Sequence, residues 1–327
     1  MTKPKLWLLL IGIAASLQVR ATIEDYYPYK VMPSSSNYGN TGILEIPNAR
    51  MMPEASLRFN FSSSFPNEFT SLTASPFNWL EASYRYVEIK NRLYGPASYS
   101  GNQSLKDKGF DIKVLIRNET YIFPSVALGL RDIAGTGLFS AEYIVSSKRI
   151  RNLDLTLGLG WGDLGRDNNI SNPLIQLNDS YRERKFDALG QGGTFDYKKW
   201  FSGETAIFGG IEYDLPRKGL RLKLEYDTTR PDMERIFKTG NRTPLEVTSR
   251  LNFGISYSLS ENFTISSSFE RGTQFRVSFN LMGNFLNDTI KKPRPKTVQK
   301  LNQDQQRNIL DDNDLLYRSL NISLRNE

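Results

Sequence analysis

The sequence contains no cysteine and no histidine, and these two absences remove whole classes of function. Without them, neither a disulfide framework nor the common Cys/His zinc sites can form. No imidazole is available as a general base, which excludes Ser-His-Asp and Cys-His catalysis. Carboxylate pairs remain the catalytic option, and no sequence pattern brings such a pair into a cleft. We therefore expect a protein that is not an enzyme and that has no metal site and no cofactor.

Long hydrophobic runs are also scarce. Only 39% of the 327 residues are hydrophobic, and the mean hydropathy is −0.45. The apolar stretch at residues 6–17 is too short for a transmembrane helix, which needs about 20 apolar residues. It follows Lys3 and Lys5 and precedes a small-residue site ending at Ala21, an arrangement typical of a cleavable signal peptide. We expect residues 1–21 to be removed on export.

The sequence is rich in strict alternation of apolar and polar residues. At residues 153–161, four leucines and Trp161 alternate with Asp154, Thr156 and two glycines. A period of two predicts a β-strand with one apolar and one polar face. The pattern predicts twelve strands, at residues 57–63, 69–74, 80–89, 110–117, 125–132, 138–147, 153–162, 205–214, 220–227, 250–259, 263–271 and 274–282.

An even number of such strands in an exported chain predicts an all-β fold, an antiparallel outer-membrane β-barrel of about twelve strands. A soluble β-sandwich is the alternative, because alternation alone does not say which face is the core. The long connections at 90–109, 163–204 and 228–249 all follow odd-numbered strands. Outer-membrane barrels have long external loops and short periplasmic turns, so this parity supports the barrel. Aromatic residues expected on the lipid-facing side are Tyr84, Tyr86, Tyr143, Trp161, Tyr213, Tyr226, Tyr257 and Phe269.

The segments outside the strands complete the expected organisation. Residues 22–55 are rich in Tyr, Pro, Ser and Gly and predict an irregular leader, on the periplasmic side or folded into the lumen. The barrel takes residues 56–283. Residues 284–327 contain a basic, proline-rich linker and a helix-compatible stretch. We expect this tail to be periplasmic and to begin a domain that the chain does not complete.

If the apolar face meets lipid, the polar face lines the lumen. The predicted lumen-lining residues are Arg58, Glu81, Arg85, Lys113, Arg117, Arg131, Glu142, Asp154, Glu212, Arg221, Lys223, Glu225 and Asp227. Such a mixture of charges can fill a barrel of intermediate width with salt bridges or can line an open pathway. The net charge of +7 is typical of a solvated basic surface, and it also suits lipopolysaccharide phosphates or an acidic polysaccharide. Export argues against nucleic acid as a partner.

Several motifs resemble one family of outer-membrane exopolysaccharide proteins, the YjbH family with its GfcD-like capsule members. The motifs are NYGNTGILEIPNARM at 37–51, KGFDIK at 108–113, ALGLRDIAGTGLFSAEY at 127–143, residues 153–162 and ISNP at 170–173. The resemblance implies a barrel linked to exopolysaccharide or capsule secretion. It also implies that this chain is the N-terminal half of a longer protein. Members are often lipoproteins, and without cysteine we expect no lipid anchor here.

The expected function is therefore a barrel in the outer membrane of a Gram-negative bacterium that assists exopolysaccharide or capsule secretion or assembly. The alternatives are a general diffusion porin and a structural or adhesive surface barrel that acts through its long loops. The expected partners are outer-membrane lipid and lipopolysaccharide, the polysaccharide and other proteins of the export machinery.

Overall fold

The computed structural model describes residues 32–184, 197–215, 219–231, 245–286 and 311–318. The chain divides into two units, residues 1–288 and residues 289–327, each described by itself. In the second unit, residues 311–318 are helical. No helix in these described ranges combines the length and the apolar character needed to cross a membrane.

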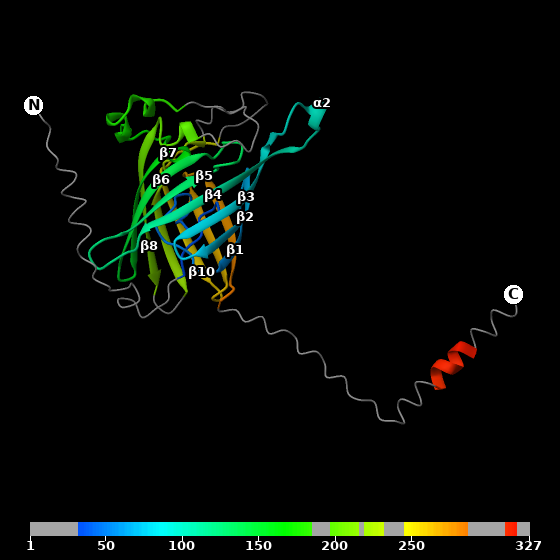
Figure 1. The fold of residues 1–327 in the computed structure, drawn as a ribbon. Helices are drawn as coiled ribbons and strands as arrows, with labels where there is room; N and C mark the ends of the chain where they lie inside the picture. Colours follow the sequence, from blue (N-terminus) through cyan, green and yellow to red (C-terminus); the bar gives the residue numbers. More distant parts are fainter. Residues whose placement is uncertain (1–31, 185–196, 216–218, 232–244, 287–310, 319–327) are drawn as a thin grey trace, which may run out of the picture. The chain divides into compact units, whose positions relative to one another are not determined.

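The first unit is a closed barrel of antiparallel strands (Figure 1). The described residues form twelve strands: β1 (Ser56–Ser64), β2 (Asn67–Phe77), β3 (Leu80–Leu93), β4 (Ser104–Arg117), β5 (Ser125–Arg131), β6 (Ala141–Ile150), β7 (Leu153–Gly162), β8 (Thr205–Leu215), β9 (Leu220–Tyr226), β10 (Leu251–Ser258), β11 (Phe263–Glu270) and β12 (Gln274–Asn284). Each strand pairs with its neighbours in sequence, and β1 also pairs with β12. The predicted twelve-stranded antiparallel barrel is confirmed, and the sandwich alternative is wrong.

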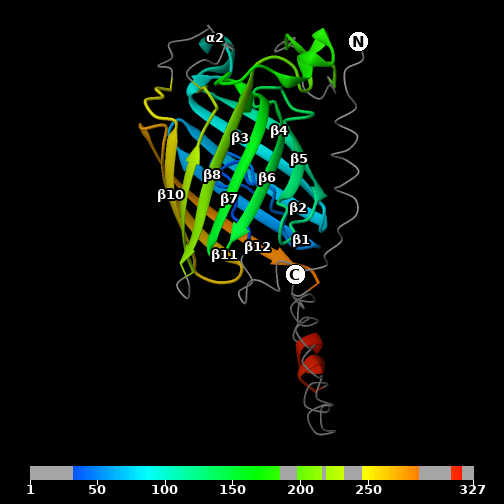
Figure 2. The ribbon, with the colours of Figure 1, turned by 90° about the vertical axis from the view of Figure 1, so that its left-hand side faces the viewer.

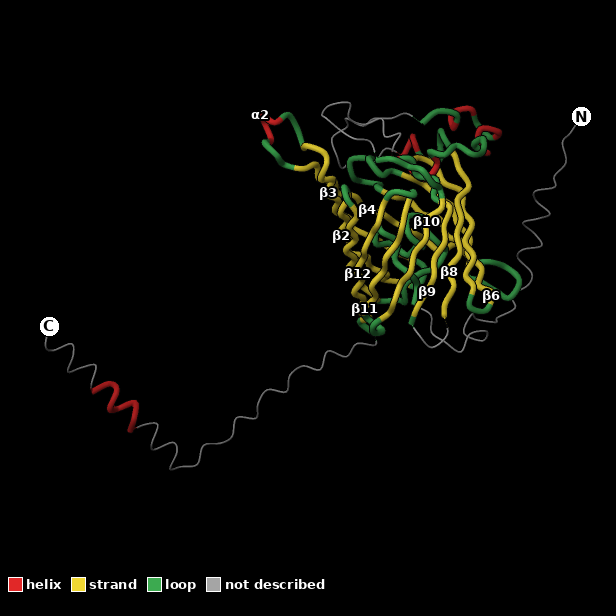
Figure 3. The backbone as a smooth tube through the Cα atoms, turned by 180° about the vertical axis from the view of Figure 1, so that it is seen from behind, coloured by secondary structure: helices red, strands yellow, loops and turns green. Residues whose placement is uncertain are grey.

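One predicted loop is largely strand. The connection expected at 90–109 contains the ends of β3 and β4, which stay paired as a hairpin that projects from the barrel (Figures 1 and 3). Glu88 lies directly opposite Lys106 in this hairpin, and opposite charges across a pair stabilise it. The four-residue helix α2 (Ala97–Ser100) lies at the tip. Sequence alternation misses residues 90–93 of β3 and residues 104–109 of β4.

The two ends of the barrel differ. Short turns follow the even-numbered strands, at the end where the chain enters β1 and leaves β12. The opposite end carries the long segment between β7 and β8, which contains the 3-10 helices η2 (Asp163–Gly165), η3 (Pro173–Gln176), η4 (Asp179–Tyr181) and η5 (Tyr197–Lys199). Figure 2 shows this segment above the strands. The long connections therefore follow odd-numbered strands, as the loop lengths predicted.

The outer face of the barrel is apolar and exposed. Large side chains that face outward with more than a third of their surface exposed include Phe59, Leu72, Tyr84, Phe110, Ile144, Leu157, Ile211, Leu222, Ile255, Phe269 and Phe279. The side chains between them point inward and are mostly polar and buried. This distribution is the reverse of a soluble protein, in which the apolar face is the core.

Candidate functional site: the plugged lumen

The segment that precedes β1 folds back into the barrel. Every residue from 36 to 49 is buried, although this stretch contains Asn, Ser, Thr and Glu as well as apolar residues. Figure 1 shows the segment, in blue, inside the ring of strands. We call residues 34–52 the plug. The leader was expected either on the periplasmic side or in the lumen, and the structure places the plug in the lumen.

The plug is a compact series of turns rather than a regular element. The N–H of Asn37 donates to the carbonyl of Leu44 at 2.7 Å, and the N–H of Ile43 donates to the carbonyl of Ile46 at 2.9 Å. Gly39 has a φ of +94°, a conformation that glycine adopts without strain. A Cβ at Gly39 would lie 1.6 Å from the Oγ of Ser71 on β2. The tip of the plug therefore lies so close to β2 that a side chain at residue 39 would clash with Ser71.

Carboxylates of the wall accept hydrogen bonds from the plug backbone. Glu225 on β9 accepts from the N–H groups of Leu44, Glu45 and Ile46 at 2.9, 2.8 and 3.3 Å. Glu81 on β3 accepts from the N–H of Met52 at 2.8 Å. A buried irregular segment leaves many backbone donors without partners, and each unpaired donor costs free energy. The wall supplies those partners.

Lysines of the wall donate hydrogen bonds to the backbone carbonyls of the plug. Lys223 donates to the carbonyl of Ile43 at 2.8 Å. Lys113 donates to the carbonyls of Thr41 and Arg50 at 3.1 and 2.7 Å. The wall therefore holds the plug at both its donors and its acceptors, from opposite sides of the barrel.

The plug has its own charged residues, and each has partners on the barrel. Glu45 lies 2.8 Å from Arg271 and 3.3 Å from Arg276. Burial raises the pKa of Glu45, but the two guanidinium groups outweigh burial and hold that pKa at about 2. Arg50 lies 2.7 Å from Asp154 and 2.6 Å from Glu119. Burial lowers the pKa of Arg50, and these two carboxylates more than reverse the shift.

Apolar side chains fill the rest of the lumen. Tyr38 of the plug packs edge to face on Phe69 and Phe139, with ring centroids 5.0 and 5.9 Å apart. The guanidinium of Arg131 lies over the Tyr38 ring at 3.9 Å from its centroid. Burial raises the pKa of Tyr38, so its hydroxyl stays neutral. The lumen thus has a packed interior like that of a soluble domain.

A second apolar cluster corrects one prediction. Ile43, Leu44 and Ile46 of the plug pack in one cluster with Tyr143 and Phe208 of the wall. Tyr143 was expected on the lipid-facing side, and that prediction is wrong. The inward position is possible because Gly129, opposite on β5, leaves room: a Cβ there would lie 2.1 Å from the Tyr143 ring.

Most of the predicted lumen-lining residues meet at the plug. The residues that contact it by a hydrogen bond, an ion pair or a guanidinium over a ring are Arg58, Glu81, Arg85, Lys113, Arg131, Asp154, Glu212, Arg221, Lys223 and Glu225. Asp227 is buried beside them and lies 3.2 Å from Arg271, which in turn binds Glu45. Burial raises the pKa of Asp227.

Two predicted residues do not line the lumen. Arg117 lies at an irregularity between β4 and β5, where its guanidinium covers the Phe123 ring at 4.1 Å. Glu142 lies opposite Trp161, on the outer side of β6 and β7. The Glu142 carboxylate accepts from Arg184 at 2.6 and 2.8 Å, so the long β7–β8 segment covers it. Trp161 packs on Phe201 of that segment with ring centroids 5.2 Å apart, and it is buried rather than exposed to lipid.

Sequence reasoning missed the partners of Glu45. Arg276 occupies an inward position of β12, between the outward Phe275 and Val277, so alternation could have found it. Arg271 lies in the turn before β12, where no periodic signal exists. Glu45 itself is a single carboxylate in the apolar run Ile43 to Ile46, which is a signal of a buried charge with a partner.

The described ranges hold no cluster suited to a metal ion. No group of three or more carboxylates there is arranged to hold a metal ion. The buried carboxylates described above bind cations, hydroxyls or backbone donors. The arrangement serves to hold one segment of the chain inside the barrel.

The fold and this interior define a class of protein, a closed antiparallel β-barrel whose lumen is occupied by an N-terminal segment of the same chain. The chain belongs to the YjbH family: the family model described as "Exopolysaccharide biosynthesis protein YbjH" matches residues 34–325. It is 39% identical over 279 residues to a protein of Escherichia coli K12 called "Uncharacterized lipoprotein YjbH". That match covers 85% of this chain and 38% of the relative, so the chain spans about two fifths of the relative's length.

Solved structures with a similar fold include outer-membrane porins. The KdgM porin in complex with disordered oligogalacturonate matches with a TM-score of 0.36 and 11% identity, over 70% of this chain and 99% of that chain. The NanC porin matches with a TM-score of 0.33 and 10% identity, over 69% of this chain and 97% of that chain.

Proposed function

We propose that this chain is an outer-membrane β-barrel, without enzymatic activity, that assists the secretion or assembly of exopolysaccharide or capsule. The observation that carries the proposal is the family match over residues 34–325. The exposed apolar outer face supports the membrane location, because lipid is the solvent that such a face requires. The proposed partners are outer-membrane lipid and lipopolysaccharide, the polysaccharide and other proteins of the export machinery.

The plug argues against the alternative of a general diffusion porin. A porin needs a continuous water-filled lumen. Here residues 36–49 are buried inside the barrel, and ion pairs at Glu45 and Arg50 hold them there. A barrel filled in this way suits a component of a secretion or assembly machinery better than a free channel for solutes.

The projecting β3–β4 hairpin is the feature that favours the adhesive alternative. Its tip exposes Tyr94 and Tyr99, which are 55% and 82% exposed. Exposed aromatic rings at the end of a projecting hairpin are suited to contact with another surface. Removal of residues 94–103 should therefore abolish surface binding if the protein is an adhesin, and leave surface polysaccharide unchanged.

Deletion of the gene tests the proposal. We expect the deletion strain to lose surface polysaccharide, measured by quantitative glycan staining of intact cells, and complementation with the full chain to restore it. Uptake of small hydrophilic solutes should stay unchanged. Full surface polysaccharide in the deletion strain would overturn the proposed role.

A further inference from the structure

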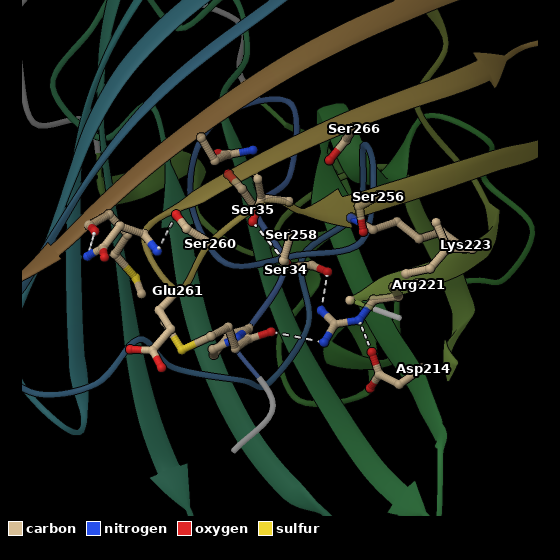
Figure 4. A pocket seen from close by; sticks show the side chains of 18 of the residues that line it. Ser34, Ser35, Asp214, Arg221, Lys223, Ser256, Ser258, Ser260, Glu261 and Ser266 are labelled. Carbon is tan, nitrogen blue, oxygen red and sulfur yellow. Dashed lines mark hydrogen bonds and ion pairs between the residues drawn. The ribbon is translucent and has the colours of Figure 1, made fainter. Parts of the chain in front are cut away.

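A cavity of about 340 Å³ lies beside the plug, at the end of the barrel that carries the short turns. It lies between the start of the plug, at Ser34 and Ser35, and the inner faces of β9 to β12 and β1 (Figure 4). Its volume falls within the range of about 300–1,000 Å³ that is common for ligand sites. The plug blocks the lumen beyond it, so the cavity is a recess rather than a passage.

Hydroxyl groups form one wall of this recess. Ser256 and Ser258 of β10 and Thr264 and Ser266 of β11 line it. Near the recess the inward positions on these strands carry serine and threonine, whereas Asn252 and Glu270 occupy inward positions farther along the same strands. Figure 4 shows the serines directed toward the same space as Ser34 and Ser35. Serine and threonine hydroxyls can donate and accept, which suits the hydroxyl groups of a sugar.

Asn280 of β12 adds an unpaired polar atom to this wall. Its side chain is 7% exposed, and its Oδ1 has no hydrogen-bond partner among the described residues. A buried polar atom without a partner is rare in native structures and calls for an explanation such as a ligand or an ion. Asn280 lines the recess, and its unpaired oxygen is itself buried, so it adds polarity to this wall.

Cations flank the hydroxyl wall, on β9 beside β10 and on β1 beside β12. Arg58, Arg149, Arg221 and Lys223 line the recess, against Asp214 and Glu261. Asp214 is shared between Arg149 and Arg221. Arg58 is 2% exposed, and among the described residues it has no ion pair within 4.0 Å. Its guanidinium donates to the carbonyl of Pro33 at 3.1 Å and to the hydroxyl of Thr41 at 3.4 Å, and Glu81 supplies a favourable charge interaction without direct contact. An anion in direct contact would lower the cost of burying this guanidinium further.

We infer that this recess binds an anionic sugar unit, with its carboxylate at Arg58 and its hydroxyls on the serine wall. The inference rests on the proposed function and names the chemistry of the glycan that the barrel handles. Guanidinium pairs with carboxylate in a planar, charge-assisted contact, and the hydroxyl wall meets the sugar ring. The recess opens at the short-turn end, where a periplasmic chain end would arrive.

The test is binding of two matched disaccharides to the purified full chain in detergent micelles, by isothermal titration calorimetry. The probes are cellobiouronic acid, which carries one carboxylate, and cellobiose, its neutral counterpart. We expect cellobiouronic acid to bind at least tenfold more tightly than cellobiose. Equal affinities for the two disaccharides would overturn the inference. So would acetate that displaces cellobiouronic acid as effectively as unlabelled cellobiouronic acid does, because the sugar ring would then contribute nothing.

Variants locate the site. Arg58→Gln should weaken cellobiouronic acid binding at least tenfold, whereas Arg117→Gln, an arginine at the same end that lies outside the recess, should leave binding unchanged. Ser266→Leu, which fills the recess without removing a charge, should abolish binding and serves if Arg58→Gln does not fold. Retention of the heat-modifiable gel migration of the closed barrel is the folding control.

The binding experiment and the deletion experiment can overturn the recess and the proposed function independently of each other. Full surface polysaccharide in the deletion strain would overturn the proposed function and leave disaccharide binding as it stands. Tight cellobiouronic acid binding that Arg58→Gln and Ser266→Leu both leave unchanged would overturn the recess as the site, whatever the deletion strain shows.

Discussion

At the scale of single residues, the decisive feature is the contact between a buried carboxylate of the plug and two buried guanidinium groups of the barrel. Glu45 lies between Arg271 and Arg276, and all three are nearly inaccessible to solvent. A buried ion pair adds little stability over an apolar replacement, but loss of one partner is costly. Glu45 therefore fixes the position of the plug more than it adds to the total stability.

Glu45→Gln tests this at the residue scale. The folded-state pKa of Glu45 is about 2, below its usual 4.5, so its contribution is complete above pH 4.5 and is lost as the pH falls through 2. At pH 7 we expect the variant to lose about 3 kcal/mol, measured by urea unfolding in lipid vesicles. The difference should vanish near pH 2. Glu54→Gln, an exposed carboxylate of the same leader, should have no effect, and a pH-independent loss for Glu45→Gln would contradict the account.

At the scale of elements, the plug depends on close approach to the wall. Gly39→Val would place a side chain on Ser71 and force a strained φ, so we expect a loss of about 3 kcal/mol in urea unfolding. Gly137→Val is the matched control, since Gly137 also has a positive φ but a Cβ there meets only Lys199, at 3.6 Å. Equal losses for the two variants would show that the plug tip does not contact β2.

The strands were predictable from sequence, and the lumen was one of two positions predicted for the leader, but the contacts that hold the plug were not predictable. Alternation located all twelve strands because their two faces meet different environments. Successive side chains point to opposite faces, so the polarity of each residue indicates which face it lies on. The sixth strand was predicted three residues early because Leu138 and Phe139, which lie before β6, are apolar for another reason: they pack with Tyr38. The plug has no period, and its burial depends on partners more than 200 residues away, as between Glu45 and Arg271. No local pattern encodes such pairs.

At the scale of the whole molecule, the barrel is polar and packed inside and apolar outside. The interior accounts for the low mean hydropathy, because the inward positions carry charged and small polar side chains. The outer face is expected to contact lipid, and the closed strand order leaves no unpaired edge between β1 and β12.

Ile255→Arg tests the proposed lipid contact. Ile255 faces outward near the middle of β10 and is 42% exposed. A charge there should cost about 2–4 kcal/mol in vesicles, because arginine at the bilayer midplane is unfavourable. Leu177→Arg, a change in the long β7–β8 segment at a residue that is 79% exposed, should cost little. Equal effects would show that the outer face of the barrel meets water.

The most direct test of the central claim, that the chain plugs its own lumen, is conductance in planar lipid bilayers. The full chain should give no porin-like current steps, because residues 36–49 fill the barrel. A variant that lacks residues 34–52 should conduct, since its lumen keeps the charged wall without the segment that occupies it. Current steps from the full chain as large as those from the deletion variant would contradict the account.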